Sequence, residues 1–480
     1  MNGRSNTKPF LLGLVVALGF GLVGYWLLVP TGPKLEVRVP IPENHPDPNA
    51  AASEENKNPG TFSAGSGTPS PLLGSWPQFR GPNRDGIVQD MPIANTWPEV
   101  GPPLVWSLEV GEGHAGAVIH NGCVYLVDYD EEKKEDVVRC LSFDNGEEIW
   151  RYTYYSKVKR NHGMSRTVPA VSDDYLVTMG PKCKVHCFNP ATGEPIWKKD
   201  LVQEFGTVIP EWYAGQSPLM EEDRVILGTG GRCLLIAVEL ATGNVLWETP
   251  NELGWEMTHS SILPIEFNGK KQYVWCASGG VVGVDGESGD LLWSYPDWKI
   301  RIATIPSPVD IDQGRIFLSG GYDAGSLMLQ LSKSDRGFVA EPTFKLESTI
   351  FGAIQQTPLF FKGFIYGTDQ SGHLACLSPE GERLWVREED DFGLGPFSIV
   401  DNKLSILDDN GKKPGELCLF EVSKEGAKKL TGAKVVEGHD AWAPMAFADG
   451  RVILRDATTM KCLDLTVSGE IQTAESNREN

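Results

Sequence analysis

The chain has 480 residues, and its 64 acidic residues outnumber its 43 lysines and arginines, which gives a formal net charge of −21 at neutral pH. This balance lacks the basic footprint of a nucleic-acid-binding protein, so we exclude nucleic acid as a partner class. An acidic surface favours solubility and cationic partners, but it carries no information about the fold.

The first segment of the chain predicts a membrane anchor. Residues 10–29 carry no charge, and at 1.5 Å per residue such a run spans about 30 Å of hydrocarbon. Arg4 and Lys8 precede it, so the positive-inside rule places residues 1–8 in the cytoplasm. The alternative is a cleaved signal peptide, which has a shorter apolar core and a small-residue cleavage site. We therefore favour an uncleaved single-pass helix over 9–29 in a bacterial inner membrane, with the remaining chain on the periplasmic side.

The region after the anchor is predicted to be a tether. Residues 30–74 are rich in proline, glycine, serine, asparagine and glutamate. Such a composition buries too little apolar surface to fold alone, so we expect a disordered segment that holds the next domain away from the membrane. Residues 468–480 are predicted to form a disordered tail.

A recurring tryptophan dominates the chain after residue 75. Successive members are 44, 47, 50, 46 and 92 residues apart, and they are Trp106, Trp150, Trp197, Trp247, Trp293 and Trp385. Most of these tryptophans are the last residue of a recurring motif such as Ala191-Thr-Gly-Glu-Pro-Ile-Trp197. A period of roughly 40–50 residues indicates a repeat architecture. Because the same position faces a different direction in every repeat, we interpret these tryptophans as packing residues and not as one ligand-stacking surface.

Each repeat contains four short runs of aliphatic and aromatic residues separated by Gly, Asn and Asp, which is strand and turn chemistry. Four antiparallel strands at this period predict an all-β, eight-bladed β-propeller over 75–467. Two units, at 303–347 and 395–436, lack the tryptophan. The last unit has only three strands, and we expect residues 103–110 to supply the fourth and so close the ring.

The nine cysteines are not arranged as a metal site. Cys140, Cys187 and Cys376 occupy the same place in the third strand of their repeats, where cysteine acts as a small buried hydrophobe. Equivalent positions in different blades mostly lie too far apart to form disulfides. Paired C-x-x-C ligands are absent, so we predict no metal site. Mostly unpaired cysteines are unexpected outside the cytoplasm, where disulfides are permitted.

The residues just before the first strand of each blade converge on one end of the ring axis. They are polar or aromatic and differ between blades: His114, His162, Arg166, Trp212, Gln216, His259, Arg301, Gln355, Gln356 and Trp442. One interpretation is a water-filled channel whose polar residues satisfy exposed backbone groups. The other is a pocket for an anionic or aromatic ligand, with Arg166 and Arg301 as charge partners. No nucleophile–base pair or carboxylate dyad can be assigned, so no catalytic residue is predicted.

Two sets of motifs carry a resemblance to a known family. The recurring motif Ala-Thr-Gly-Glu-x-x-Trp resembles the pyrroloquinoline-quinone (PQQ)-like propeller repeat. The segment Trp76-Pro-Gln-Phe-Arg-Gly-Pro-Asn-Arg-Asp-Gly86, followed by Gly101-Pro-Pro-Leu-Val-Trp106, resembles the opening of exported propellers common in planctomycete-type bacteria. The resemblance covers about residues 75–467, and it is specific for the fold and weak for function.

The resemblance implies two activities. One branch of the family resembles the assembly factor BamB, a non-enzymatic ring that scaffolds other proteins. The other comprises quinoprotein dehydrogenases that hold PQQ and a calcium ion at the axis. In the larger members of this branch, the resemblance implies a site that contains a vicinal Cys-Cys disulfide and calcium-ligating Glu and Asn residues. This chain has no adjacent cysteines and no C-x-x-C-H haem motif.

We therefore expect a membrane-anchored scaffold for other extracytoplasmic or membrane proteins, without a cofactor. The alternative is a quinoprotein-type oxidoreductase with PQQ and calcium, or a small-ligand binder that uses the axial funnel. A carbohydrate-binding ring based on Trp212 and Trp442 is a third hypothesis.

Overall fold

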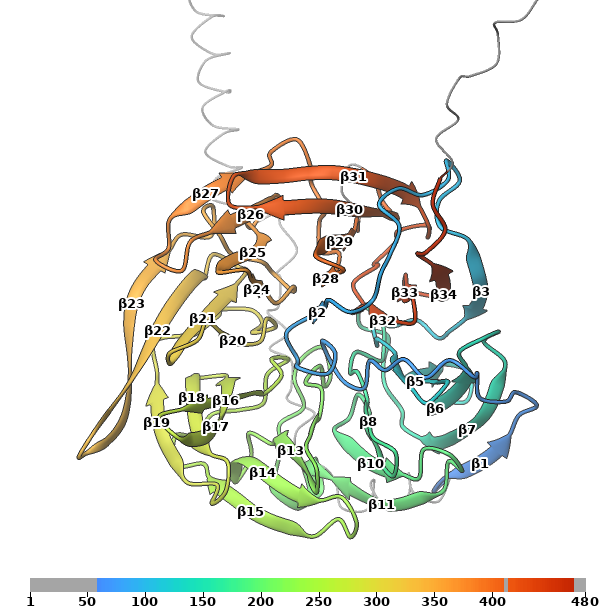
Figure 1. The fold of residues 1–480 in the computed structure, drawn as a ribbon. Coiled ribbons are helices and arrows are strands. Elements are labelled where there is room, and N and C mark those ends of the chain that lie inside the picture. The colour runs from blue at the N-terminus through green and yellow to red at the C-terminus, as the bar shows by residue number, and fades with distance from the viewer. Residues whose placement is uncertain (1–57, 410–412, 470–480) are drawn as a thin grey trace, which may run out of the picture. The chain divides into compact units, whose positions relative to one another are not determined.

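The computed structural model describes residues 58–409 and 413–469. The predicted anchor at 9–29, the first part of the predicted tether and almost all of the predicted tail lie outside these residues. Within the described part of the chain, no helix combines the length and the apolar character needed to cross a membrane. The described residues form eight β-sheets arranged around one axis, which confirms the eight-bladed all-β propeller (Figure 1).

The first four blades follow one another in chain order. Blade 1 consists of β4 (Val118–His120), β5 (Cys123–Asp130), β6 (Glu135–Ser142) and β7 (Glu148–Tyr155). Blade 2 consists of β8 (Ala170–Val171), β9 (Leu176–Met179), β10 (Lys184–Phe188) and β11 (Pro195–Asp200). Blade 3 consists of β12 (Leu219–Met220), β13 (Arg224–Gly228), β14 (Cys233–Glu239) and β15 (Val245–Pro250). Blade 4 consists of β16 (Leu263–Phe267), β17 (Lys270–Ala277), β18 (Gly280–Asp285) and β19 (Leu291–Tyr295).

The other four blades complete the ring. Blade 5 consists of β20 (Val309–Asp310), β21 (Arg315–Gly320), β22 (Gly325–Ser334) and β23 (Gly337–Leu346). Blade 6 consists of β24 (Leu359–Phe361), β25 (Phe364–Thr368), β26 (Leu374–Leu377) and β27 (Arg383–Val386). Blade 7 consists of β28 (Phe397–Val400), β29 (Lys403–Leu407), β30 (Glu416–Ser423) and β31 (Gly426–Lys434). Blade 8 consists of β32 (Ala446–Ala448), β33 (Arg451–Arg455), β34 (Thr459–Asp464) and β3 (Leu104–Glu109).

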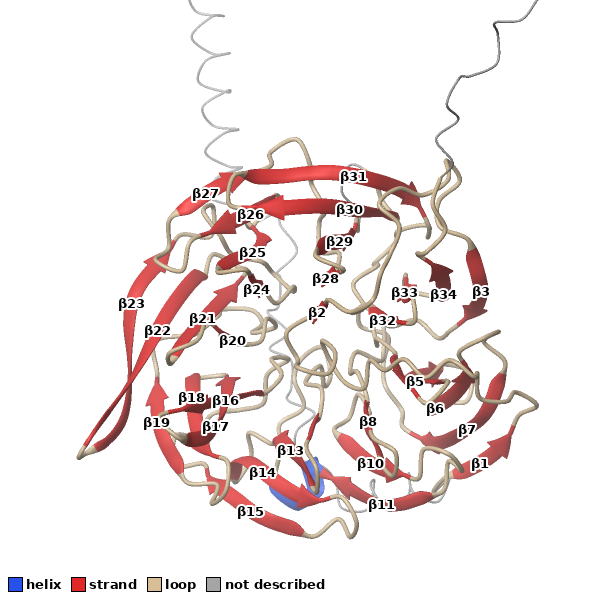
Figure 2. Ribbon diagram, viewed as in Figure 1, coloured by secondary structure: helices blue, strands red, loops and turns tan. Residues whose placement is uncertain are grey.

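The strands within each blade are antiparallel neighbours, with the first strand nearest the axis and the last on the rim (Figure 1). Almost all regular structure is strand, and the described residues contain one short helix, α3 (Leu201–Phe205), after β11 (Figure 2). The Asp200 side chain caps this helix by accepting hydrogen bonds from the backbone N–H groups of Val202 and Gln203.

The two ends of the repeat tract meet in blade 8, as the sequence predicts. Strand β3 pairs antiparallel with β34, and the register places Trp106 opposite Cys462. The ring is therefore closed by hydrogen bonds between segments at least 350 residues apart in the sequence. This closure removes an open sheet edge that would otherwise be exposed.

The start of the ordered region differs from the sequence prediction. We expected disorder up to residue 74, but β1 (Thr61–Ala64) adds a fifth strand to the outer edge of blade 1. Its four residues pair with β7, from Thr61 opposite Thr153 to Ala64 opposite Trp150. All four residues of β1 are exposed. The strand is held by backbone pairing with an available edge, which composition does not reveal.

The recurring motif that ends in the blade tryptophan forms the contact between adjacent blades. The glycine of this motif has a positive φ of 70–77° in four blades, and an added Cβ would come within 2.6–2.9 Å of the tryptophan ring of the preceding blade. These pairs are Gly146 with Trp106, Gly193 with Trp150, Gly243 with Trp197, and Gly289 with Trp247. The turn therefore requires glycine both for its backbone conformation and for the space under the indole.

The indole N–H groups of four blade tryptophans donate to backbone carbonyls of the next blade: Trp106 to Phe143, Trp150 to Pro190, Trp197 to Leu240, and Trp385 to Ser423. Trp293 donates instead to the side-chain oxygen of Gln272, and the buried N–H of Trp247 has no partner among the described residues. These bonds and the glycine contacts place five of the six rings, all but that of Trp293, against the next blade.

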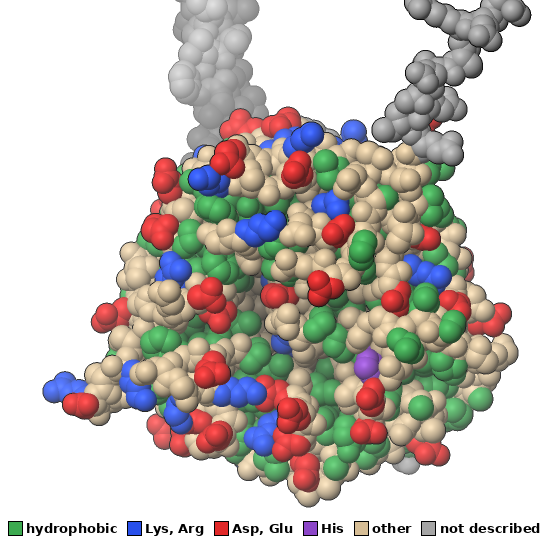
Figure 3. All heavy atoms as spheres, in the orientation of Figure 1, with side chains coloured by type: hydrophobic (Ala, Val, Ile, Leu, Met, Phe, Trp, Pro, Cys, Tyr) green, Lys and Arg blue, Asp and Glu red, His purple; other side chains and the backbone are tan. Residues whose placement is uncertain are grey.

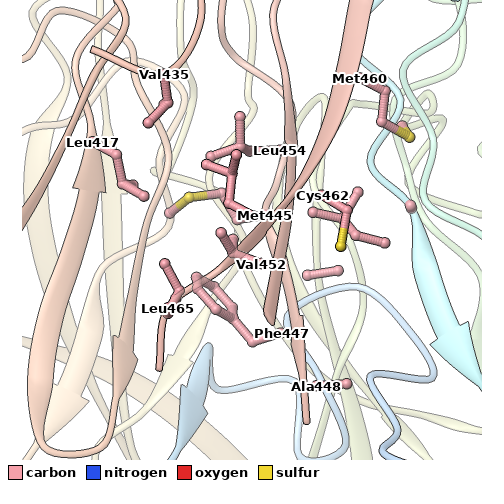
Figure 4. Close-up of a cluster of buried hydrophobic side chains, with 14 of the residues drawn as sticks. Leu417, Val435, Met445, Phe447, Ala448, Val452, Leu454, Met460, Cys462 and Leu465 are labelled. Carbon is pink, nitrogen blue, oxygen red and sulfur yellow. The ribbon is translucent and has the colours of Figure 1, made fainter. Parts of the chain in front are cut away.

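Aliphatic side chains fill the space between neighbouring sheets. Figure 4 shows this at the junction of blades 7 and 8, where Leu417 of β30 faces Met445 and Leu454. All nine cysteines are buried and unpaired. On the face seen in Figure 1, acidic and basic side chains are scattered among hydrophobic ones and do not form one continuous patch (Figure 3).

Candidate functional site

The segment 76–88, which we call the axial plug, crosses the middle of the ring (Figure 1). At its start, Trp76 and Ile119 of β4 exchange two backbone hydrogen bonds of 2.8 and 3.0 Å. At its end, β2 (Ile87–Val88) pairs parallel with β28, the innermost strand of blade 7. The plug therefore connects blade 1 to blade 7 across the axis.

Two arginines attach the plug to other blades. The Arg80 guanidinium donates to the carbonyls of Thr357 and Pro358 in blade 6, at 2.8 and 2.9 Å. It also donates to the carbonyls of Arg84 and Asp85 within the plug, at 3.1 and 2.7 Å. Arg84 donates to the carbonyl of Pro218 in blade 3 at 3.1 Å. The backbone N–H of Val171 in blade 2 donates to the carbonyl of Pro77 at 2.8 Å. The plug therefore contacts blades 1, 2, 3, 6 and 7.

Burial affects both of these guanidinium groups. It lowers the pKa of Arg80 to about 10, and burial together with the neighbouring Arg80 charge lowers the pKa of Arg84 to about 9. Both groups remain protonated at neutral pH. In the sequence this motif carries only a family resemblance, and its position at the axis was not predicted. Two arginines and two glycines within seven residues were the available signal.

A cavity of about 310 Å³ lies on the axis, between the plug and the loops that precede the first strands. Eight of the ten predicted funnel residues line it: His114, His162, Arg166, Trp212, His259, Gln355, Gln356 and Trp442. The plug contributes Trp76, Phe79 and Arg80 to its wall, and none of these three was predicted. Ala303 before blade 5 and Phe397 of blade 7 also line the cavity, so residues from all eight blades and from the N-terminal plug meet around one space.

Two predicted residues are not part of this wall. Gln216 is fully buried, and its side-chain oxygen accepts a hydrogen bond from the backbone N–H of Gly228 at 2.8 Å. That bond links the loop to β13 of the same blade. Arg301 is exposed and lies outside the cavity lining. Of the two arginines predicted as charge partners of an anionic ligand, Arg166 lines the cavity and Arg301 does not, because the loop before blade 5 contributes Ala303 and Ile305 to the lining instead.

His114 is oriented by its neighbours. Its Nε2 donates to the carbonyl of His162 at 2.7 Å, and because a carbonyl can only accept, Nε2 carries the hydrogen and Nδ1 is an acceptor. The ring stacks on Trp442 with centroids 4.5 Å apart, and the Trp442 indole N–H donates to the Asp409 carboxylate. The Nδ1 atom of His114 is buried and has no partner among the described residues.

The imidazoles of His114 and His259 are neutral at neutral pH. Burial, and then the nearby Arg166 charge, lowers the pKa of His114 to about 3. The same two causes lower the pKa of His259 to about 4, and its ring lies 6.3 Å from that of Trp212. Arg166 is thus close enough to affect both histidines and is the dominant charge of this part of the cavity.

Gln356 is held in a similar way. Its amide nitrogen donates to the carbonyl of Gly395 at 2.9 Å, which leaves its oxygen facing away from that contact. The oxygen is buried and has no partner among the described residues. His114 and Gln356 thus each use one polar atom to fix the side chain and keep one acceptor atom unused.

The donor set of the cavity does not fit a calcium ion. Calcium takes six to eight oxygen ligands, several of them carboxylates, but no lining residue is Asp or Glu. Within the described residues there is also no group of three or more His, Cys, Asp or Glu placed to hold a metal. The residues of the wall therefore do not fit the calcium–PQQ arrangement, and we derive no redox step from them.

A family model described as "Outer membrane protein assembly factor BamB" matches residues 133–387. One relative is the outer membrane protein assembly factor BamB of Shewanella oneidensis, which is 21% identical over 306 residues, or 60% of this chain and 71% of that protein.

Solved structures also resemble the ring. The quinohemoprotein alcohol dehydrogenase of Comamonas testosteroni has a TM-score of 0.56 at 14% identity, and covers 84% of this chain and 82% of its own. The BamB structure from Moraxella catarrhalis has a TM-score of 0.51 at 12% identity, and covers 75% of this chain and 99% of its own. At these identities, the similarity concerns the fold alone.

Proposed function

The chain belongs to the PQQ-like propeller family described as outer membrane protein assembly factor BamB, and on this premise we propose that it is a protein-binding scaffold of the cell envelope. In this proposal the segment 9–29 anchors the ring in the inner membrane and the ring binds envelope proteins on the periplasmic side. The relative from Shewanella oneidensis, an assembly factor by its name, supports this role.

The rim of the ring carries the proposal. Strand β1 lies on the outer edge of β7 and makes four antiparallel residue pairs there. The rim is thus compatible with an added extended segment, which is the strand-addition mode of peptide recognition. The observation that supports protein binding is that the ring already uses this mode on one blade.

Adjacent blades offer the same kind of edge. The outer strands β11 and β15 are terminal in their sheets, and no described strand covers them. Each exposes an aliphatic side chain, with Ile196 41% and Leu246 44% exposed. An uncovered edge flanked by exposed apolar groups is a site where another chain can pair. Leu291 of β19 and Val339 of β23 are also exposed on terminal strands. We place the partner contact on the rim of blades 2 and 3, because these follow blade 1, where a strand is already added.

The oxidoreductase alternative lacks support in the cavity. A quinoprotein site needs oxygen ligands for calcium, and the wall supplies arginines, imidazoles and amides instead. Adding PQQ with calcium and following dye reduction with alcohols and sugars tests this alternative directly. Substrate-dependent reduction of the dye would contradict the scaffold proposal.

Site-directed photocrosslinking tests the rim. A photoreactive phenylalanine analogue is placed at Ile196 or Leu246 of the full chain in envelopes of the source organism. The matched control is Leu73, which is 74% exposed but lies outside any strand and so offers no sheet edge. We expect light-dependent adducts with the same envelope protein at positions 196 and 246 and none at 73. Equal adducts at all three positions, or none, would refute the rim as the binding surface.

A further inference from the structure

The axial cavity has an unusual charge composition. The chain contains 64 acidic residues, yet the cavity wall contains none, while Arg80 and Arg166 both contribute to it. In an acidic protein, a cavity lined by two cations without any carboxylate is selective for negative charge.

Arg166 has unused hydrogen-bonding capacity. It donates to the carbonyls of Asn161, His162 and Gly163, at 2.8, 2.8 and 3.2 Å. These are three of the five N–H groups of a guanidinium, and their acceptors are uncharged. No carboxylate lies within ion-pair distance of it in the described residues. A partly desolvated cation without a counter-charge is costly, and an anionic group in the cavity would relieve that cost.

Two acceptors add a second requirement. The Nδ1 atom of His114 and the side-chain oxygen of Gln356 are buried without partners, and the two residues are only 6% and 8% exposed. Both line the cavity. Because an acceptor is satisfied only by an N–H or O–H group, a ligand that fits this wall also carries donors such as hydroxyls.

The shape of the wall adds a third requirement. Trp442 lies against His114, and Trp212 and Phe79 contribute further aromatic surface. Flat aromatic surfaces favour the faces of ring-shaped ligands. The volume of about 310 Å³ is at the lower end for ligand sites, so it suits a molecule of about one ring.

We propose that the axial cavity binds a small ring-shaped carboxylate that carries hydroxyl groups. Its carboxylate pairs with the free N–H groups of Arg166, its hydroxyls donate to His114 Nδ1 and Gln356 Oε1, and its ring lies against the tryptophans. Two kinds of molecule share this chemistry, namely sugar acids such as a hexuronate and hydroxylated aromatic acids. This site is separate from the rim and does not depend on the scaffold role.

Titration calorimetry on the purified full chain tests the proposal. The probes are galacturonate and 4-hydroxybenzoate, which distinguish the two kinds of acid, and the neutral sugar galactose, which keeps the ring but lacks the charge. We expect saturable binding of at least one acid and at least tenfold weaker binding of galactose, since a hydrogen bond to a charged group contributes about a factor of ten or more. This comparison needs no variant and so does not depend on how well a variant folds.

Two variants locate the binding. Arg166→Gln removes the proposed charge partner, and we expect it to weaken binding of the acid about tenfold or more. Arg301→Gln is the matched control, because Arg301 is exposed and outside the cavity, and we expect no change. The proposal is wrong if neither acid binds saturably up to about 10 mM, the range of the weakest specific complexes. It is also wrong if galactose binds as tightly as the acids, or if the two variants lose affinity equally.

Discussion

The plug should open when Arg80 is replaced by methionine. Of the four hydrogen bonds that the guanidinium donates, two cross from the plug to blade 6, at Thr357 and Pro358, and only these resist movement of the plug away from the ring. At about 1.5 kcal/mol for each bond from a charged donor, their loss lowers the free energy of local opening by about 3 kcal/mol. At 1.36 kcal/mol for each factor of ten, this corresponds to roughly 150-fold faster amide exchange in the plug.

Hydrogen exchange followed by mass spectrometry measures this effect on peptides covering 76–88. The matched control is Arg84→Met, which removes one bond to another blade, at Pro218, and should accelerate exchange only about tenfold by the same arithmetic. Exchange in β17 should not change in either variant. If Arg80→Met left the plug as protected as in the unmodified chain, or if Arg84→Met opened it equally, the guanidinium of Arg80 would not be its main attachment.

Two further predictions concern the blades. Trp197→Phe should lower the free energy of unfolding by about 1–2 kcal/mol more than Trp247→Phe. The first variant loses a 2.7 Å hydrogen bond to the Leu240 carbonyl, whereas the second loses an N–H donor that has no partner among the described residues. Urea unfolding measures the difference, and equal shifts of the two midpoints would contradict it. Burial, and then the charges of nearby lysines, lowers the pKa of His186 to about 3. Between about pH 3 and the ordinary histidine pKa of about 6.5, the unfolded chain therefore binds a proton at this position that the folded chain does not. Stability consequently falls as the pH falls through that window. His186→Phe should make the pH dependence of unfolding shallower by about 1.4 kcal/mol per pH unit near pH 5, and an unchanged slope would show that this histidine is protonated in the folded ring.

Part of the candidate site could be predicted from the sequence. The period of the repeats locates the loops before each first strand, and these loops all open toward the axis, so His114, Arg166 and Gln356 could be assigned to one funnel. Gln216 and Arg301 do not line the cavity, because the period assigns a loop and not the direction of each side chain within it. The side-chain oxygen of Gln216 bonds to β13, and a competing local bond of this kind leaves no trace in the spacing.

The fold was determined by local chemistry that the sequence displays directly. A glycine with positive φ, followed a few residues later by a tryptophan that packs on the next turn, is a short-range device repeated along the chain, and its period indicates both the blade and the number of blades. Only the tertiary structure decided what lies at the axis and on the rim. Arg80 contacts carbonyls 277 and 278 residues away, and β1 pairs with an edge that exists only once blade 1 has formed. The first contact depends on closure of the ring and the second on the folding of blade 1, so no local pattern of residues encodes either of them.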